Sequence, residues 1–394
     1  MYIKLFIAFI FLLNSSALAA LPSAAPPLPE VKKKAIKVKN VDSLYKVISK
    51  LKSNSTILLN KGIYKLTKPI QIPDGLKNIT IRGNTGKFED VILKGAGMNN
   101  KAVWHGIMIN GSTDILIADL TIGWLGIHPI TINPKAQNVH IYHCRLVDAG
   151  EQFVKANSAT NGNGSNNGKV EYCLIEYTEE GPPNGYTNGV DVHGGDNWEI
   201  RHNVFRNIKT PAKAKYKHVP AVLMWNGAKN TICESNTFIN CDRAIAFGLT
   251  KRKDYPDHEG GLIQNNFIYV DKSKVKHPDT GIFVASANTK IYHNTIILNK
   301  SYPNAIEVRF DLAKNVEVYN NLCDAKIRAR DGAQLKESGN VLDINKRIFA
   351  DCNFADLHLI RTDGLKEVTK KVIDQDWDGP LKKGSKIFPG ADQL

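Results

Sequence analysis

A long-period repeat runs through the middle of the chain and restricts its fold more than any other feature. Segments of the form Asn/Gly-x-x-apolar-x-x-Asn recur with spacings of 33, 30, 28 and 27 residues and end at Asn203, Asn236, Asn266, Asn294 and Asn321. Weaker copies upstream end at Leu120, Cys144 and Cys173. A period of this size indicates a solenoid, a propeller or an array of repeats.

The residues inside each repeat favour strands over helices. Each repeat holds short runs of alternating apolar and polar residues, rich in Ile, Val, Phe and Tyr, which are typical of strands. No repeat has ten residues with helical periodicity, so a helical solenoid is not expected. Propeller blades need roughly 40 residues or more, so one turn of a β-helix fits better. We predict an all-β fold, a single-stranded right-handed parallel β-helix over residues 41–350.

The asparagine that ends each repeat suits a corner between two strands, because Asn tolerates left-handed backbone conformations. Stacked one rung apart, at about 4.7–4.9 Å, these amides can bond to one another in a ladder. We therefore assign the five asparagines to the fold and not to a reaction. Cys144 and Cys173 occupy the same column on adjacent rungs, where either a disulfide or two buried thiols would fit.

The first 40 residues lack the repeat. Residues 1–20 combine Lys4, an apolar run and small residues near Ala20, which is typical of a signal peptide. Residues 21–40 are rich in Pro and Lys and are interpreted as a linker. The mature protein is therefore expected to be secreted or periplasmic, without a transmembrane anchor, and monomeric.

Both ends of a β-helix need a cover, because they expose unpaired strand edges. Residues 42–52 predict an amphipathic capping helix at the N-terminal end, with Asp42 or Ser43 as N-cap. Residues 351–394 are less periodic and are expected to form a capping segment at the other end.

The formal net charge is +14, or +13 once Lys4 is removed with the signal peptide. In an exported protein this charge favours an anionic polymer or a membrane surface over nucleic acid as a partner. Solubility alone would also account for it. The expected partner is an acidic polysaccharide, and no nucleic acid is expected.

Several segments resemble secreted bacterial β-helix proteins. The opening, DSLYKVISKLKSNSTILLNKGIYKL (42–66), is similar to the N-terminal cap of polysaccharide lyases of the pectate lyase and chondroitinase B types. The closing segments FADLHLIRTDG (354–364) and DWDGPLKKGSKIFPGADQL (376–394) are similar to the end of the same group. The resemblance covers nearly the whole mature chain and implies a parallel β-helix related to enzymes of acidic polysaccharides.

A sharper local match is GVDVH (189–193), which is similar to the Asp-x-His motif of alginate C5-epimerases. The sites of those enzymes also use a Tyr just upstream and a Lys from the preceding rung. The resemblance thus implies Lys155, Tyr186, Asp191 and His193 as catalytic residues. The epimerases carry an acidic residue soon after the His, whereas two glycines follow here and would let a ligand approach closely.

Alternation along the strands predicts which side chains point outward. With Val190 and Val192 in the core, Asp191 and His193 face solvent together, and Lys155 lies on the rung before them. An aromatic platform and charged groups on later rungs would complete a groove for a sugar chain. The candidate substrate-binding residues are Trp225, Arg243, Glu307 and Arg309.

Lyases and C5-epimerases of uronates begin by removing the proton next to a carboxylate, which needs a base and neutralisation of that carboxylate. His193 is a candidate base that Asp191 orients. Lys155 neutralises the carboxylate or, if desolvated, is itself the base. Tyr186 then donates a proton to the leaving oxygen or to carbon. A lyase acting by β-elimination is the leading hypothesis; a C5-epimerase and a non-catalytic carbohydrate-binding protein are the alternatives.

Several of these residues also have an interpretation that is purely structural. The Asp-x-His pair and Lys155 could be ordinary surface groups, and Asp242–Arg243 could be an ion pair between rungs. No cofactor is certain. Calcium is the one candidate, with oxygen ligands available from Glu151, Asp191 and Asp196, although no calcium-loop spacing is present.

Overall fold

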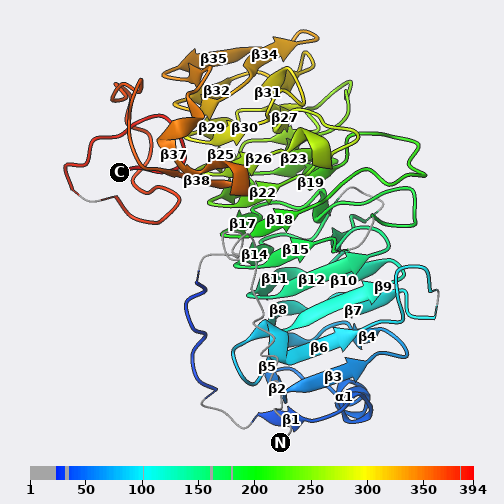
Figure 1. Ribbon diagram of the computed structural model, residues 1–394. Helices are drawn as coiled ribbons and strands as arrows, with labels where there is room; N and C mark the ends of the chain where they lie inside the picture. Colours follow the sequence, from blue (N-terminus) through cyan, green and yellow to red (C-terminus); the bar gives the residue numbers. More distant parts are fainter. Residues whose placement is uncertain (1–23, 32–34, 101, 160–162, 179–180, 382) are drawn as a thin grey trace, which may run out of the picture.

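Three parallel sheets run the length of the molecule in the computed structural model, which describes residues 24–31, 35–100, 102–159, 163–178, 181–381 and 383–394 (Figure 1). Each rung contributes one strand to sheet A, one to sheet B and one to sheet C, in that order along the chain. Every strand within these sheets pairs in parallel with the equivalent strand of the next rung, as in β10 with β13. The predicted parallel β-helix is confirmed.

The described part of the chain gives sheet A 12 strands, sheet B 11 and sheet C 10. Sheet A consists of β1 (Ile36–Val38), β2 (Ser55–Leu59), β5 (Lys77–Gly83), β8 (Thr113–Ala118), β11 (Gln137–Tyr142), β14 (Lys169–Glu171), β17 (Glu199–Arg201), β21 (Ile232–Glu234), β25 (Leu262–Gln264), β29 (Lys290–Tyr292), β32 (Val316–Tyr319) and β35 (Leu335–Ser338). Sheet B consists of β3 (Gly62–Lys65), β6 (Val91–Lys94), β9 (Thr121–Leu125), β12 (Arg145–Ala149), β15 (Leu174–Glu176), β18 (Val204–Arg206), β22 (Thr237–Ile239), β26 (Phe267–Tyr269), β30 (Thr295–Ile297), β33 (Leu322–Cys323) and β36 (Val341–Leu342). Sheet C consists of β4 (Ile70–Ile72), β7 (His105–Ile109), β10 (His128–Ile132), β13 (Val154–Ala156), β16 (Val190–His193), β19 (Pro220–Trp225), β23 (Arg243–Phe247), β27 (Ile282–Val284), β31 (Asn304–Arg309) and β34 (Lys326–Arg330).

Smaller elements lie outside these sheets. A narrow three-stranded sheet adds a fourth side to the middle rungs and contains β20 (Ala228–Lys229), β24 (His258–Glu259) and β28 (Ser286–Ala287). An antiparallel pair near the C-terminus contains β37 (Phe349–Asp351) and β38 (Asp356–Leu359). Within the residues that the structure describes, the helical elements are α1 (Val41–Ile48) and the 3₁₀ turns η2 (Phe88–Asp90), η3 (Lys272–Lys274), η4 (Lys346–Ile348) and η5 (Cys352–Phe354).

The core is a set of aliphatic columns, because the parallel register places equivalent side chains one above another. One column of sheet C is fully buried over nine rungs and contains Ile70, Ile107, Ile130, Val154, Val190, Val222, Ile245, Ile282 and Ile306. Because this column points inward, the next residue of each strand points away from the core. The packing of the inner face therefore determines which side chains lie on the outer face of sheet C.

The predicted asparagine ladder is present. The side-chain amide of each of the five asparagines donates to the amide oxygen of the next at 2.9–3.0 Å, and the file continues to Asn340. Cys144 and Cys173 occupy the same column below it, as predicted, with the backbone N–H of Cys144 3.4 Å from the sulfur of Cys173. Both are buried free thiols, and so the thiol alternative holds in this structure.

The residues that begin the repeat form a second ladder that the sequence analysis does not anticipate. They adopt left-handed φ angles, 57° at Asn197 and 54° at Asn315, and their exposed amides bond from rung to rung. The left-handed turn explains why Asn recurs at the start of the repeat. At the other end the expectation is wrong, because the left-handed residue is the one before each ladder asparagine, namely His202, Ser235, Asn265, His293 and Asn320. The five ladder asparagines therefore owe their place to the buried amide ladder and not to a left-handed backbone.

The N-terminal cap differs in detail from the prediction. The helix starts earlier, at Val41, because Asn40 is the N-cap: its side chain accepts from the backbone N–H of Ser43, and the Ser43 hydroxyl lies 3.3 Å from the Asn40 N–H. Leu44 and Ile48 are buried against the first rung, as expected. Part of the predicted linker is structured, since β1 pairs with β2 and extends sheet A. The predicted signal peptide lies outside the described residues.

The C-terminal segment takes a different place from the one predicted. It packs along the side of the β-helix, against the outer face of sheet B, and not over the last rung (Figure 1). Leu357 and Leu359 of β38 join a buried cluster with Phe267, Ile297 and other outward side chains of sheet B. These outward residues are apolar and need a cover. The last strand of sheet C, with sequence KIRAR, instead carries charges that protect its open edge.

Within the described residues there is no helix with the length and apolarity needed to cross a membrane.

Candidate functional site

Three polar side chains from two neighbouring strands meet on the outer face of sheet C. Lys155 of β13 lies opposite Asp191 of β16 in the parallel register, and His193 is two residues further along β16. The Lys155 Nζ atom lies 2.6 Å from Asp191 Oδ2 and 2.6 Å from His193 Nε2. His193 Nε2 lies 3.4 Å from Asp191 Oδ1. The sequence thus predicts the outward direction and the proximity of these three residues.

Asp191 itself is not solvent-facing, contrary to the prediction. Its side chain has no exposed surface, because the indole N–H of Trp225 donates to Oδ1 at 2.9 Å and the amide of Gln152 reaches Oδ2 at 3.4 Å. Burial acts to raise the pKa of Asp191, but hydrogen bonds and charges from His193 and Lys155 outweigh it and leave that pKa below its ordinary value. The carboxylate is therefore a buried negative charge that holds the groups above it.

Solvent reaches the cluster through its other two members. The side chains of Lys155 and His193 are 14% and 19% exposed. Trp225 lies opposite His193 in register, with its ring centroid 4.6 Å away and the two planes inclined by 57°. Trp225 thus forms one wall of the site, and its proposed contact with sugar remains a prediction.

The second ring nitrogen of His193 is held by residues that the sequence analysis does not identify. The side-chain nitrogen of Asn226 lies 2.6 Å from His193 Nδ1, and the guanidinium of Arg252 donates to the oxygen of the same amide. Arg252 is fixed by Asp257, which accepts from its Nε at 2.7 Å and from the backbone N–H of Asn226 at 3.0 Å. Asn226 directly follows the predicted Trp225, whereas Arg252 comes from a loop without any periodic signal.

This arrangement determines which groups near Lys155 can accept a proton. Because Arg252 holds the amide oxygen of Asn226, the NH₂ group faces Nδ1 of His193, and an NH₂ group only donates. Nδ1 must then offer its lone pair, so the proton of a neutral His193 is on Nε2. The 2.6 Å contact between Nε2 and Lys155 needs one donor and one acceptor. The acceptor in this contact is an uncharged Lys155, whereas the charged form of Lys155 forms the ion pair with Asp191. Only the uncharged form offers a lone pair on the open side of the cluster.

We predict that Asn226→Asp shifts the acid limb of the pH–kcat/KM profile upward by about one pH unit. A carboxylate accepts a hydrogen bond from Nδ1, so the variant favours the neutral tautomer of His193 with its proton on Nδ1. Nε2 then accepts from a charged Lys155, which therefore loses its proton only at higher pH. If the cluster transfers a proton in a reaction, the pH profile of the purified variant in that reaction measures the shift. Arg252→Lys, which retains a donor to the amide oxygen, should move the limb less. An unchanged profile for Asn226→Asp would show that the amide does not set the protonation of the cluster.

Tyr186 lies beside this cluster with its hydroxyl buried and without a hydrogen-bond partner among the described residues. Burial raises the pKa of Tyr186, and the charge of Asp191 adds to this, while Asn188 and Arg243 act against it. The hydroxyl is therefore a neutral donor. The side-chain oxygens of Gln152 and Asn188, which lie in the segments that lead into β13 and β16, are also buried without partners among the described residues. Buried orphaned polar atoms are rare in folded proteins, and three of them at one place indicate a site for a polar ligand.

The two glycines after His193 do not form a clearing. A Cβ atom on Gly164 would lie 2.2 Å from the carbonyl oxygen of His193, and a Cβ atom on Gly195 would lie 2.4 Å from that of Ser165. The loop around Gly164 therefore fills the space that the sequence analysis reserved for a ligand. Glycine is required here because two stretches of backbone pack together.

The site continues from Lys155 toward the N-terminal rungs. Thr131 lies opposite Lys155 in register, and its hydroxyl is 2.9 Å from Nδ1 of His105. His128 Nδ1 lies 2.8 Å from the carbonyl oxygen of Gln152, so Nδ1 carries the proton. Burial lowers the pKa of His128 to about 3 and keeps the ring neutral. Polar side chains thus line the outer face of sheet C over several rungs.

Three predicted substrate-binding residues have other partners. Arg243 is buried, pairs with Asp279 in the segment that leads into the next rung, and lies over the ring of Phe283. The structural alternative of an ion pair between rungs is thus confirmed for Arg243, with Asp279 as the partner. Glu307 is 2% exposed and accepts from the Asn304 amide at 2.5 Å.

Arg309 is the third of these residues. It shares sheet C with Lys155, but its strand is three strands beyond that of Trp225. The Arg309 Nε atom donates to Asp331 at 2.6 Å. Between these strands the outer face is covered by a buried apolar cluster that includes Leu223, Ala246 and Phe283. The predicted stripe is therefore interrupted after Trp225.

The three candidate calcium ligands are not brought together. Asp191 bonds Lys155 and Trp225, Glu151 lies 4.0 Å from His128, and Asp196 lies in the turn after β16. Within the described residues, no group of three or more His, Cys, Asp or Glu side chains is arranged to hold a metal ion.

No family model matches the chain, and no curated protein matches it. Among solved structures it is similar to an alginate lyase from Paenibacillus sp. str. FPU-7, with 15% identity over 78% of this chain and 95% of that chain and a TM-score of 0.45. A pectate lyase matches with 12% identity over 92% and 98% of the two chains and a TM-score of 0.48. The A-module of a mannuronan C-5 epimerase from Azotobacter vinelandii matches with 11% identity over 77% and 88% and a TM-score of 0.44. At these identities the likeness concerns the fold, and it assigns no role to any residue here.

Proposed function

We propose that the protein is an exported polysaccharide lyase that cleaves a uronate-containing polymer by β-elimination at the Lys155–Asp191–His193 cluster. The observation that carries this proposal is the double contact of Lys155 Nζ, 2.6 Å from Asp191 and 2.6 Å from His193, on the outer wall of the β-helix. A partly exposed nitrogen with a lone pair, above a buried carboxylate, is a suitable base for a proton on a sugar ring.

In the proposed reaction Lys155 removes the proton on C5 of a uronate unit. The electrons of the C–H bond form a C4=C5 double bond, and the bond between C4 and the bridging oxygen breaks. The negative charge that develops on the sugar carboxylate accepts a hydrogen bond from Nε2–H of His193. Asp191 keeps Lys155 and His193 in place and takes no proton itself.

Tyr186 is the proposed proton donor to the leaving oxygen. Its raised pKa keeps the hydroxyl protonated, and the hydroxyl is buried next to the side chain of Asn188. One proton leaves C5 and one proton is added to the leaving oxygen, so the reaction needs no co-reactant. The products are two shorter chains, one of which ends in an unsaturated sugar.

C5 epimerisation is the second candidate. The observation that favours it is that the base and the proton donor come from different segments of the chain. Lys155 is on β13, and Tyr186 is in the segment before β16. If Tyr186 protonates C5 on the face opposite Lys155, the configuration inverts and the chain stays intact. The two candidates share the first step and differ in the atom that receives the second proton.

A panel of acidic polymers tests the lyase proposal. The mature protein is incubated with alginate, polygalacturonate and glycosaminoglycans, and the ultraviolet absorbance of the new enoate is followed with time. We expect absorbance to rise on at least one polymer, and an Asp191→Asn variant at equal concentration to be strongly impaired. No rise on any polymer would contradict elimination, and inversion at C5 without cleavage would support the second candidate.

A further inference from the structure

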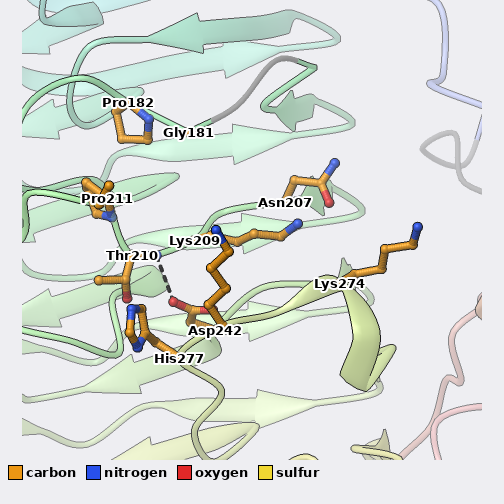
Figure 2. A pocket seen from close by; sticks show the side chains of 11 residues that line it. Gly181, Pro182, Asn207, Lys209, Thr210, Pro211, Asp242, Lys274 and His277 are labelled. Atoms are coloured by element: carbon orange, nitrogen blue, oxygen red, sulfur yellow. Dashed lines mark hydrogen bonds between the residues drawn. The ribbon is translucent and has the colours of Figure 1, made fainter.

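A pocket of about 430 Å³ opens where several strands of sheet C begin, apart from the Lys155 cluster. It is lined by segments that lead into β16, β19, β23 and β27. In the view of Figure 2, Asn207, Lys209 and Lys274 lie on one side of Asp242, while Pro182 and Pro211 lie on the other. The volume is within the range of about 300–1,000 Å³ that small-molecule sites occupy.

The lysines on the cationic side of this pocket form no ion pair with another described residue. Among the described residues, no ion pair includes Lys209, Lys274 or Lys276. Burial lowers the pKa of Lys209, and the nearby Cys241 and Asp242 only partly offset this effect. A half-buried ammonium group beside two other lysines is a position that an anion would stabilise.

The floor of the pocket has the opposite character. Asp242 is 2% exposed, and its Oδ2 accepts from the backbone N–H of Thr210 at 2.7 Å (Figure 2). Its other oxygen, Oδ1, is buried without a hydrogen-bond partner among the described residues. A buried acceptor without a donor is costly, and a hydroxyl group from a ligand would satisfy it.

We propose that this pocket binds one sugar-acid unit of an acidic polysaccharide, as an anchor separate from the reacting unit. The ammonium groups at the rim bind the carboxylate of the sugar, and Asp242 Oδ1 accepts from one of its hydroxyls. Pro182 and Pro211 offer apolar faces to the ring. Asp242 would repel a simple phosphate, and a neutral sugar would leave the lysines unused, so a ligand with both a carboxylate and hydroxyls fits best.

The inference rests on the proposed function only for the choice of polymer. One connected segment, residues 207–219, lines the pocket and then leads into β19, which ends at Trp225 in the wall of the cluster. A polymer held in the pocket would thus be kept close to sheet C. Cleavage is not needed for this binding, so the two proposals fail separately.

The test measures binding without turnover. All variants are made in the full mature chain with Lys155→Arg, and their dissociation constants for alginate and polygalacturonate are measured by calorimetry. The pocket variant is Lys209→Gln with Lys276→Gln. The control is Lys77→Gln with Lys336→Gln, two exposed lysines of sheet A that remove the same charge.

We expect the pocket variant to weaken binding of at least one polymer about tenfold, roughly threefold for each ammonium, and the control less than about twofold. Ala212→Trp, which fills the pocket from an exposed position on its wall and changes no charge, should weaken binding to a similar extent. Equal effects of the pocket and control variants would overturn the proposal, because only net charge would then matter. Competition by inorganic phosphate as strong as that by glucuronate would also overturn it.

Discussion

Lys155→Arg is expected to lower kcat/KM by about 10³-fold, within the range for loss of a general base. Arginine keeps a positive charge that can pair with Asp191, but it stays protonated at any pH used in the assay and so cannot accept a proton. The variant should therefore fold and bind polymer like the wild type while failing to remove the C5 proton. Initial rates on the polymer selected by the panel measure the loss.

A neutral replacement completes this experiment. Lys155→Met removes the amine in both of its forms, the charged form that pairs with Asp191 and the uncharged form that accepts a proton. It leaves Asp191 buried without its partner, so it should be inactive and also less stable. The comparison separates two roles of Lys155. If Lys155→Arg retains more than about a tenth of wild-type activity and Lys155→Met does not, Lys155 acts through its charge and another group is the base.

Asn266→Ala is expected to lower the free energy of unfolding by about 3–5 kcal/mol, since several buried polar groups lose their partners at once. The backbone N–H and the side-chain amide of Asn236 both donate to the Asn266 oxygen at 3.0 Å. The amide nitrogen of Asn266 in turn donates to Asn294 Oδ1 and to the carbonyl oxygen of Cys233, each at 2.9 Å. Alanine supplies none of these contacts. Urea unfolding followed by circular dichroism measures the change.

The second ladder provides the matched control. Asn315→Gly removes an exposed amide contact to Asn288 and keeps the left-handed backbone, which glycine adopts freely. It should change the free energy of unfolding by no more than about 0.5 kcal/mol. Similar losses in both variants would mean that the buried ladder contributes no more than the exposed one.

The repeat was sufficient to predict the β-helix and the outward direction of Lys155, Asp191 and His193, whereas the resemblance to alginate C5-epimerases singled these three residues out. Residues with a fixed place in each rung stack in register, so the buried residues on either side of Lys155 and Asp191 determine both position and direction. These are Val154, Ala156, Val190 and Val192. The same reasoning places Cys144 and Cys173 in the column of the ladder asparagines. These predictions need only the period and the alternation of strands.

Features formed by the segments between strands could not be predicted in this way. Arg252, which orients Asn226, and Asp279, which pairs with Arg243, both lie in segments without periodicity. The burial of Asp191 depends on how Trp225 and Gln152 fold over it. The C-terminal segment covers sheet B because that outer face is apolar in the later rungs, a property visible only once the strands are assigned to sheets.

Proton exchange at C5 tests the central claim most directly, because lyase and epimerase share that step. The polymer is incubated with the protein in D₂O and examined by ¹H NMR. The account predicts either a vinyl signal from a new C4=C5 bond or loss of the H5 signal through deuterium incorporation, and neither change with Lys155→Arg. An unchanged H5 signal in a polymer that the protein demonstrably binds would contradict the assignment of this cluster as a site of proton transfer.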